Sequence, residues 1–362
     1  MKNTFGNSLS ITLFGESHGE AVGAVIDGLA PGIEIDEKFI EEKTDKRRAY
    51  GKISTQRQEE DKVEIVSGVF RGFTEGTPLT VIIRNKDVRS DDYDRGTARP
   101  GHADYTAYRK YHGFEDYRGG GHFSGRLTAP VVAAGAVVLS ALNKKGIYIG
   151  THIKKCAGVS DRDFDIIEDD IKALDGKLFS VLCPDAEAKM KAKIEEAAKD
   201  GDSVGGILET AIIGLPEGLG EPWFDSFESM LSHGIFSIPA VKGIEFGKGF
   251  EFADMKGSEA NDLLAFRNGK IITLTNNNSG LNGGITNGMP VIFKTAVKPA
   301  PSIFKPQKTV DFIAGENIEL KLSGRHDPCI VHRAAVVQDA ITALVTADLL
   351  TVKFGTDYLS NY

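Results

Sequence analysis

Seven short segments of this chain place charged or hydroxyl side chains next to glycine or proline. They are GESHG at 15–19, KRRAYGKISTQR at 46–57, RPGHAD at 99–104, RGGGHFSGR at 118–126, TNNNSGLNGG at 275–284, KPAPS at 298–302 and GRHDP at 324–328. Glycine frees the backbone to bend and lets another molecule approach closely. Each segment alone is also typical of an ordinary polar turn, because short motifs often match by chance. Their combination is therefore more informative than any one of them.

Histidine and arginine are the residues of these segments with the clearest chemistry. His18 and His102 can gain or lose a proton near neutral pH, which suits general acid–base catalysis. Arginine binds phosphate and carboxylate through its planar fork. Arg126 and Arg325 each lie at the expected start of an apolar helix, where the helix dipole opposes a cation unless an anion lies nearby. The segments together predict an enzyme that binds a small, multiply charged anion, although their spacing does not name the reaction.

The same residues also have interpretations without a function. The basic segment 46–57 is typical of a solvated surface, and the Pro–Gly pair of RPGHAD is typical of a turn. Asp327 followed by Pro328 is typical of a helix start, with the carboxylate at the N-cap and proline at the first helical position. A capping carboxylate can also face a pocket, so Asp327 is predicted either as an N-cap or as a functional acid.

Composition argues against several classes of function. The chain has 362 residues, of which 41% are hydrophobic, and a formal net charge of −8. These values are typical of a globular protein without a general affinity for nucleic acid or anionic membranes. No apolar run reaches the roughly 20 residues that span a bilayer, and the start lacks a signal peptide, so we expect a cytoplasmic protein.

Metal and nucleotide motifs are missing from the sequence. Cys156, Cys183 and Cys329 are far apart in the sequence and lack metal-ligand spacing, so no metal site is expected. There is no GxGxxG between a strand and a helix and no GxxxxGK[ST], which argues against the usual dinucleotide and nucleoside-triphosphate cradles.

The hydrophobic pattern predicts many strands and a few long helices. Strand-like runs lie at 8–14, 22–28, 63–70, 79–84, 147–153, 206–214 and 290–297. An amphipathic helix is predicted over 185–201, with Asp185 as its N-cap. Segments 127–143 and 334–350 are apolar all round, which predicts helices buried on several sides. The missing βαβ alternation favours a layered α+β fold with helices enclosed by sheets. Length alone suggests about two or three domains, although single folds of this size occur.

In their order along the chain, these motifs resemble the chorismate synthase family. The resemblance rests on GESHGEAVGAVIDGLAPG (15–32), RPGHADY (99–105), YRGGGHFSGRLTA (117–129), SIPAVKGIEFG (237–247), NNNSGLNGGITNG (276–288), KPAPSI (298–303) and GRHDPC (324–329). It implies a single domain over 1–362, a layered β-α-β sandwich of helices between antiparallel sheets, and a homotetramer.

The resemblance also implies a reaction. The family converts 5-enolpyruvylshikimate 3-phosphate to chorismate and phosphate, the last step of the shikimate pathway. This anti-1,4-elimination needs reduced FMN but involves no net redox change. The substrate carries one phosphate and two carboxylates, which would account for the arginines. The long insertions of fungal members are missing here, so an external flavin reductase is expected, and NADPH would act only indirectly through flavin reduction.

Site residues follow from the resemblance position by position. The implied catalytic residues are His18 and His102 as general acids, and Asp327, which would assist removal of the substrate C6 proton. The implied substrate-binding residues are Ser17, Arg47, Arg48, Arg99, Arg126 and Arg325. The implied flavin-binding residues are His122, Phe123, Ser124, Pro239, Ala240, Gly283, Lys298, Pro299, Ala300, Pro301, Ser302 and Arg325.

This chain departs from the common family pattern at three places. His122–Phe123 replaces Arg–Ser, Lys52 replaces an arginine, and Asp339 replaces a glutamate. Two other functions remain compatible with the residues: a flavin oxidoreductase with net hydride transfer, and a non-catalytic anion-binding protein.

Overall fold

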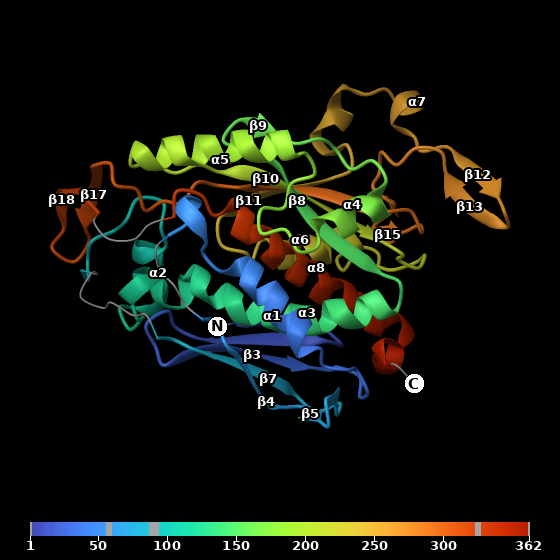
Figure 1. The fold of residues 1–362 in the computed structure, drawn as a ribbon, viewed down its shortest axis with the longest axis horizontal. Coiled ribbons are helices and arrows are strands. Elements are labelled where there is room, and N and C mark those ends of the chain that lie inside the picture. The colour runs from blue at the N-terminus through green and yellow to red at the C-terminus, as the bar shows by residue number, and fades with distance from the viewer. Residues whose placement is uncertain (1, 56–59, 87–93, 323–326, 361–362) are drawn as a thin grey trace.

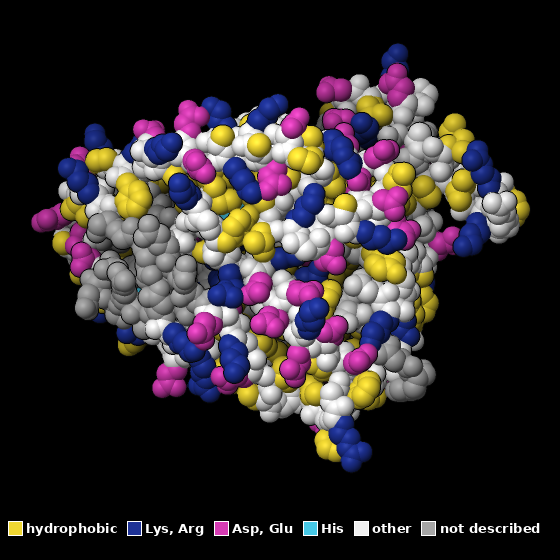
Figure 2. Space-filling model, in the orientation of Figure 1, with side chains coloured by type: hydrophobic (Ala, Val, Ile, Leu, Met, Phe, Trp, Pro, Cys, Tyr) yellow, Lys and Arg dark blue, Asp and Glu magenta, His cyan; other side chains and the backbone are white. Residues whose placement is uncertain are grey.

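Two antiparallel sheets enclose a layer of helices (Figure 1). This computed structural model describes residues 2–55, 60–86, 94–322 and 327–360. The predicted layered α+β arrangement is confirmed. Acidic and basic side chains are interspersed over the face drawn in Figure 2.

The first sheet is built from the N-terminal part of the chain. Its five strands follow the order β1-β2-β3-β7-β4. Alternate residues of β3, namely Val22, Ala24 and Ile26, are fully buried. This period of two is the pattern of a strand with one face on the core. The strands are β1 Thr4–Phe5, β2 Ser10–Gly15, β3 Ala21–Asp27, β4 Val63–Ser67 and β7 Leu79–Arg84.

The second sheet comes from the C-terminal half and follows the order β11-β16-β10-β8-β9. The register shifts between Ile207 and Leu208, where β10 pairs with β8, and again between Val241 and Gly243 in β11. The strands are β8 Tyr148–Cys156, β9 Val159–Ser160, β10 Gly206–Ile213, β11 Val241–Phe246 and β16 Val291–Val297.

Helices α3 (Thr128–Lys144) and α8 (Val331–Phe354) form the middle layer together with α1 (Glu37–Arg47). By length and composition α3 and α8 could cross a membrane, but more than four fifths of each apolar window is buried inside the protein. Gly135 lets the two helices approach, since a Cβ there would lie 2.4 Å from the Ala340 Cβ. The prediction of two enclosed apolar helices is confirmed.

The start of the chain is held by the last long helix. Asp348 of α8 accepts hydrogen bonds from the backbone N–H groups of Asn7, Ser8 and Leu9 at 2.9, 2.7 and 2.9 Å. The carboxylate is almost fully buried, and these bonds satisfy backbone donors that water does not reach.

Smaller elements connect the layers. In Figure 1 the β12–β13 and β17–β18 hairpins project at opposite ends of the sandwich. The remaining helices are α2 Asp104–Tyr111, α4 Ile167–Leu174, α5 Pro184–Lys199, α6 Phe227–Ile235 and α7 Gly257–Ala260. Single turns are η1 Gly51–Ile53, η3 Arg118–Phe123, η4 Gly125–Leu127, η5 Gly249–Asp254 and η6 Thr356–Leu359. The short strands are β5 Val69–Phe70, β6 Phe73–Thr74, β12 Leu264–Arg267, β13 Lys270–Thr273, β14 Leu281–Asn282, β15 Ile285–Thr286, β17 Gln307–Asp311 and β18 Glu316–Leu320.

Two predicted N-caps are wrong. Helix α5 begins at Pro184 with Cys183 as its N-cap, so Asp185 lies in the first turn instead of capping it. Helix α8 begins at Val331 with Ile330 as its N-cap. Asp327 therefore precedes the helix by several residues and is free to make contacts of another kind.

Candidate active site

A run of three glycines brings the two predicted catalytic histidines together. Gly119, Gly120 and Gly121 in η3 have φ angles of 60°, 82° and 52°, which glycine adopts far more readily than other residues. A Cβ on Gly119 would lie 2.2 Å from Cε1 of His18, and one on Gly120 would lie 3.0 Å from Cε1 of His102. The loop thus packs its bare backbone against both imidazole rings.

The GESHG turn is attached to the same loop by backbone contacts. It follows the end of β2 at Gly15. The Ser17 N–H donates to the Gly121 carbonyl at 3.1 Å, and Nδ1 of His122 lies 2.9 Å from the Gly15 carbonyl oxygen. Ser17 is fully buried. These contacts fix the turn that carries His18.

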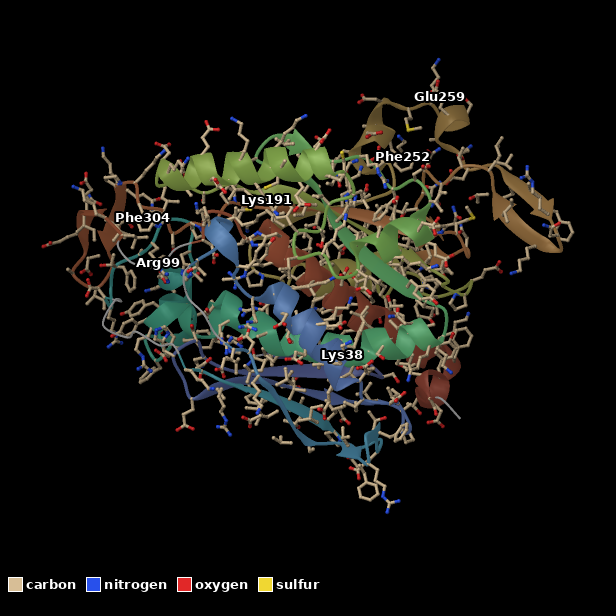
Figure 3. The ribbon with its side chains drawn as sticks, in the orientation of Figure 1. Lys38, Arg99, Lys191, Phe252, Glu259 and Phe304 are labelled. Carbon is tan, nitrogen blue, oxygen red and sulfur yellow. The ribbon has the colours of Figure 1, made fainter. Side chains whose placement is uncertain are left out.

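The RPGHAD turn leads into α2 and holds His102 through Asp104. Oδ2 of Asp104 accepts from the backbone N–H and Nε of Arg99, both at 2.9 Å. Oδ1 accepts from Nη2 of Arg99 at 2.7 Å and lies 2.7 Å from Nδ1 of His102. Burial alone would raise the pKa of Asp104, but the hydrogen bonds from Arg99 and His102 outweigh it and hold the pKa well below its usual range. Arg99 lies at the end of the sandwich where α2 is found (Figure 3).

A cavity of about 440 Å³ opens beside this turn. His102, Gly120 and His122 line it, together with the aromatic side chains Phe14, Tyr111, Phe114, Tyr117 and Phe123 and the acids Glu16, Asp104, Glu115 and Asp116. No arginine or lysine lines it in the part of the chain that the structure describes. Its aromatic walls suit a flat ring, whereas its acids disfavour a trianion.

Arginines gather in a second group, which we call the arginine cluster: Arg47, Asp61, Arg126, Asp327 and Arg333. Nη1 of Arg47 donates to Oδ2 of Asp61 at 2.9 Å, and Arg126 binds the other oxygen of the same carboxylate. The three side chains are 7%, 1% and 3% exposed for Arg47, Asp61 and Arg126. Asp61 thus neutralises part of the charge of two buried arginines.

Ionisation within the cluster follows from burial and from these contacts. Burial lowers the pKa of Arg47 to about 10, although Asp61 favours its charged form. Burial would raise the pKa of Asp61, but Arg47 and Arg126 outweigh it and keep that pKa below its usual value. The sequence analysis expected a bound ligand to supply the anion beside Arg126. In the structure, the Asp61 carboxylate of the protein itself lies there.

Asn85 connects the arginine cluster to the histidine loops. Its Oδ1 accepts from Nε of Arg126 at 2.8 Å. Its Nδ2 donates to the carbonyls of Glu16 and Gly19 at 3.0 and 2.8 Å. One side chain therefore binds both the anion-binding candidate Arg126 and the turn that presents His18.

Asp327 belongs to the cluster rather than to a helix cap. Its Oδ1 accepts from the Thr55 N–H at 2.8 Å, and its Oδ2 accepts from Nη1 of Arg333 at 2.9 Å. Nε of Arg333 donates to the Arg47 carbonyl at 2.8 Å. Residues distant in sequence thus meet at the end of α1.

Comparison with known proteins identifies the family. The family model described as chorismate synthase matches residues 9–351. The chain belongs to the chorismate synthase family. The curated chorismate synthase of Thermococcus gammatolerans is 48% identical over 352 residues, covering 95% of this chain and 96% of that protein. That of Aeropyrum pernix is 44% identical over 357 residues, covering 97% and 93%. A crystal structure of chorismate synthase superposes with a TM-score of 0.76 at 28% identity, covering 97% of this chain and 94% of that one.

The segments expected to bind flavin in chorismate synthases partly meet at the RPGHAD turn. Nζ of Lys298 donates to the Gly101 carbonyl at 2.5 Å, and its backbone N–H donates to the Ala240 carbonyl at 2.9 Å. A Cβ on Gly101 would lie 3.4 Å from Cβ of Pro301. Pro239, Pro299, Ala300 and Ser302 belong to these same two segments.

The other expected flavin residues are less closely grouped. Phe123 is 41% exposed at the cavity, and Oγ of Ser124 accepts from the Arg126 N–H at 3.2 Å. Gly283 lies in the exposed turn between β14 and β15. Among the described residues, no hydrogen bond joins this turn to the other expected flavin segments.

Three predicted positions lie away from the cluster or outside the described residues. Arg48 pairs with Asp45 at 2.8 Å and is 40% exposed. Arg325 lies outside the described residues, as does Arg57 of the basic segment. Lys52 lies exposed in η1.

Asp339, where many members have glutamate, lines a second cavity of about 180 Å³ together with Lys43 and Lys46. Burial raises the pKa of Asp339 to about 6.

Sequence reasoning missed Asp61, Asn85, Asp104 and Arg333 as members of the site. Asp104 was within a quoted motif, and its position two residues after His102 was an available signal. Asn85 directly follows a predicted strand, where site residues often lie. Asp61 and Arg333 carry no local signal of this kind.

Proposed function

We propose that this protein catalyses the anti-1,4-elimination of phosphate from 5-enolpyruvylshikimate 3-phosphate to give chorismate, with reduced FMN and without net redox change. The observation that carries the proposal is the packing of His18 and His102 against successive glycines of one loop, in a chain of this family. Such packing presents two proton-transfer groups to one site.

The residues present fit reduced FMN. The cavity walls supply aromatic side chains for an isoalloxazine ring, including Phe123. Glu16 and Glu115 in the same cavity disfavour a phosphate, so we propose that the cofactor phosphate is bound by Lys298 in the segment 298–302. When bound, reduced FMN would donate electron density transiently to the substrate, which lets the elimination proceed without net oxidation.

The arginine cluster would stabilise the departing phosphate. Developing negative charge is best met by cations already held in place, because they need no reorganisation during the reaction. Arg47 and Arg126 are held in this way by Asp61. We propose that they bind the substrate together with Ser17, Arg48, Arg99 and Arg325.

Proton transfer would fall to three side chains. His18 and His102 would act as general acids, since an imidazolium can give up its proton near neutral pH. Asp327 would assist removal of the C6 proton, with Arg333 holding its carboxylate. We further propose one domain over 1–362, a cytoplasmic homotetramer, and dependence on an external flavin reductase.

Anaerobic turnover tests this function. The protein is incubated with 5-enolpyruvylshikimate 3-phosphate, with and without reduced FMN, while chorismate absorbance and free phosphate are followed. We expect equal amounts of both products in the tube with reduced FMN only, and flavin that stays reduced. Flavin oxidised in proportion to product would instead support a hydride-transferring oxidoreductase. No chorismate in either tube would support a non-catalytic anion-binding protein.

A further inference from the structure

Asp104 makes contacts that decide where the proton of His102 lies. Its Oδ1 is 2.7 Å from Nδ1 of His102. At this distance a lone pair on Nδ1 would face the lone pairs of a carboxylate oxygen, which is repulsive. A proton on Nδ1 turns the same contact into a short, charge-assisted hydrogen bond.

The position of Arg99 agrees with this assignment. Its Nη2 donates to the same Oδ1 at 2.7 Å and lies 3.0 Å from Nδ1 of His102. Two donors that share one acceptor oxygen must lie close to each other, so the 3.0 Å separation needs no bond between them. The second carboxylate oxygen is occupied by the backbone N–H and Nε of Arg99.

The opposite edge of the imidazole faces the glycine loop and the cavity. Nε2 of His102 would lie 3.3 Å from a Cβ on Gly120, and both residues line the cavity. Among the described residues, the other acids of the cavity, Glu16, Glu115 and Asp116, have no hydrogen bond to His102. Asp104 is therefore the carboxylate that orients the ring.

We propose that Asp104 is a positioning residue that keeps a proton on Nδ1 of His102, so that the histidine exchanges its proton with the reacting groups at Nε2. The catalytic part of this inference rests on the proposed function, whereas the tautomer does not. A third group that orients a proton-transferring histidine is a recurrent arrangement in enzymes.

Asp104→Asn tests the proposal. Asparagine has one acceptor oxygen, and Arg99 presents most of the donors, so the amide NH₂ is expected to face Nδ1 of His102. The neutral ring should then carry its proton on Nε2. We expect kcat to fall at least about tenfold while KM changes less than about threefold, because orienting partners act on chemistry more than on binding.

Two measurements distinguish positioning from a general structural effect. In protein with ¹⁵N-labelled histidine, the shifts of the neutral His102 ring, assigned with His102→Asn, report its tautomer directly. We expect a proton on Nδ1 in the wild type and on Nε2 in Asp104→Asn. Asp104→Glu keeps the carboxylate and should restore the Nδ1 proton and part of kcat.

Asp170→Asn is the matched control. Asp170 also lies in the first turn of a helix, binds both terminal nitrogens of an arginine, Arg162, and accepts a backbone N–H from Asp165 at 2.9 Å. It has no histidine hydrogen bond among the described residues. We expect Asp170→Asn to leave kcat and the His102 tautomer unchanged.

Distinct outcomes separate the two proposals. An unchanged His102 tautomer in Asp104→Asn, or a wild-type ring that carries its proton on Nε2, overturns the positioning role. A wild type that makes no chorismate overturns the proposed function, and the ¹⁵N shifts still decide the tautomer.

Discussion

The histidine loops and the arginine cluster solve the same problem, holding polar groups in place, by different means. At the loops, Gly119 and Gly120 remove side chains so that backbone packs on imidazole rings. In the cluster, buried side chains of opposite charge hold one another, with Asp61 between Arg47 and Arg126. The first arrangement depends on backbone conformation and the second on charge balance, so different substitutions should damage them.

The largest effect on folding is expected from Asp61→Asn. The change removes the carboxylate between two buried arginines and leaves their charges unbalanced, which typically costs about 3–5 kcal/mol. Denaturant unfolding measures the loss. Asp45→Asn is the control, because Asp45 also pairs with an arginine but is 48% exposed, and it should lose less than about 1 kcal/mol. Equal losses would contradict the assigned charge balance.

Acid should reduce the difference between wild type and Asp61→Asn. The arginines hold the pKa of Asp61 below its unfolded value even though burial opposes this. Such a carboxylate stabilises the fold above its unfolded pKa of about 3.9 and loses that contribution as pH falls through its lower folded pKa. Unfolding measured from neutral pH down into this acid range should show the two proteins converging. A constant difference would argue against an ionised Asp61.

The next largest effect is expected from Gly119→Ala, in the histidine loops. A methyl group there would lie 2.2 Å from the His18 ring, at a φ of 60°. The strain should cost about 1–3 kcal/mol of stability, and displacement of His18 should lower kcat at least about tenfold. Unfolding and anaerobic turnover measure the two effects.

Gly158→Ala is the matched control for the clash. Gly158 also has a positive φ, 84°, but a Cβ there would meet nothing within 4 Å. This variant should lose stability through backbone strain and keep its kcat. If both variants lost kcat equally, the close approach to His18 would not be the cause.

Asn85→Ala should affect both regions by a smaller amount. It removes one bond to Arg126 and two bonds to the GESHG turn, and leaves two carbonyls and one buried arginine nitrogen with fewer partners. A cost of about 1–3 kcal/mol is expected. In a double-mutant cycle with Gly119→Ala, non-additive losses in kcat would support a connected site, and strict additivity would indicate independent regions.

The smallest effect is expected from Arg48→Ala. Its partner Asp45 is exposed, and exposed ion pairs contribute about 0–1 kcal/mol. Thermal unfolding should hardly change, whereas Arg47→Ala, one residue earlier and buried, should destabilise strongly. A large loss of stability in Arg48→Ala would mean that its surface pairing is incorrectly assigned.

The two regions also differ in how far the sequence predicts them. The glycine run and both histidines stand out locally, so the loops could be proposed from motifs alone. The same is true of the enclosed helices, because apolar residues surround segments 127–143 and 334–350 completely. Local patterns report local constraints.

The cluster could not be predicted because its pairs are separated by long stretches of chain. Asp61 meets Arg126, and Arg333 meets the carbonyl of Arg47, and no periodicity links such partners. The helix start expected at Asp327 was wrong for a related reason. Asp–Pro is a local signal for a cap, but the contacts of this carboxylate to Thr55 and Arg333 are long-range.

The contacts of Asp348 with the first residues have a consequence for synthesis on the ribosome. Backbone groups of Asn7, Ser8 and Leu9 find their acceptor only in the final helix, so the edge beside β1 cannot close until translation is nearly finished. Until then the earliest part of the nascent polypeptide stays exposed to proteases and chaperones.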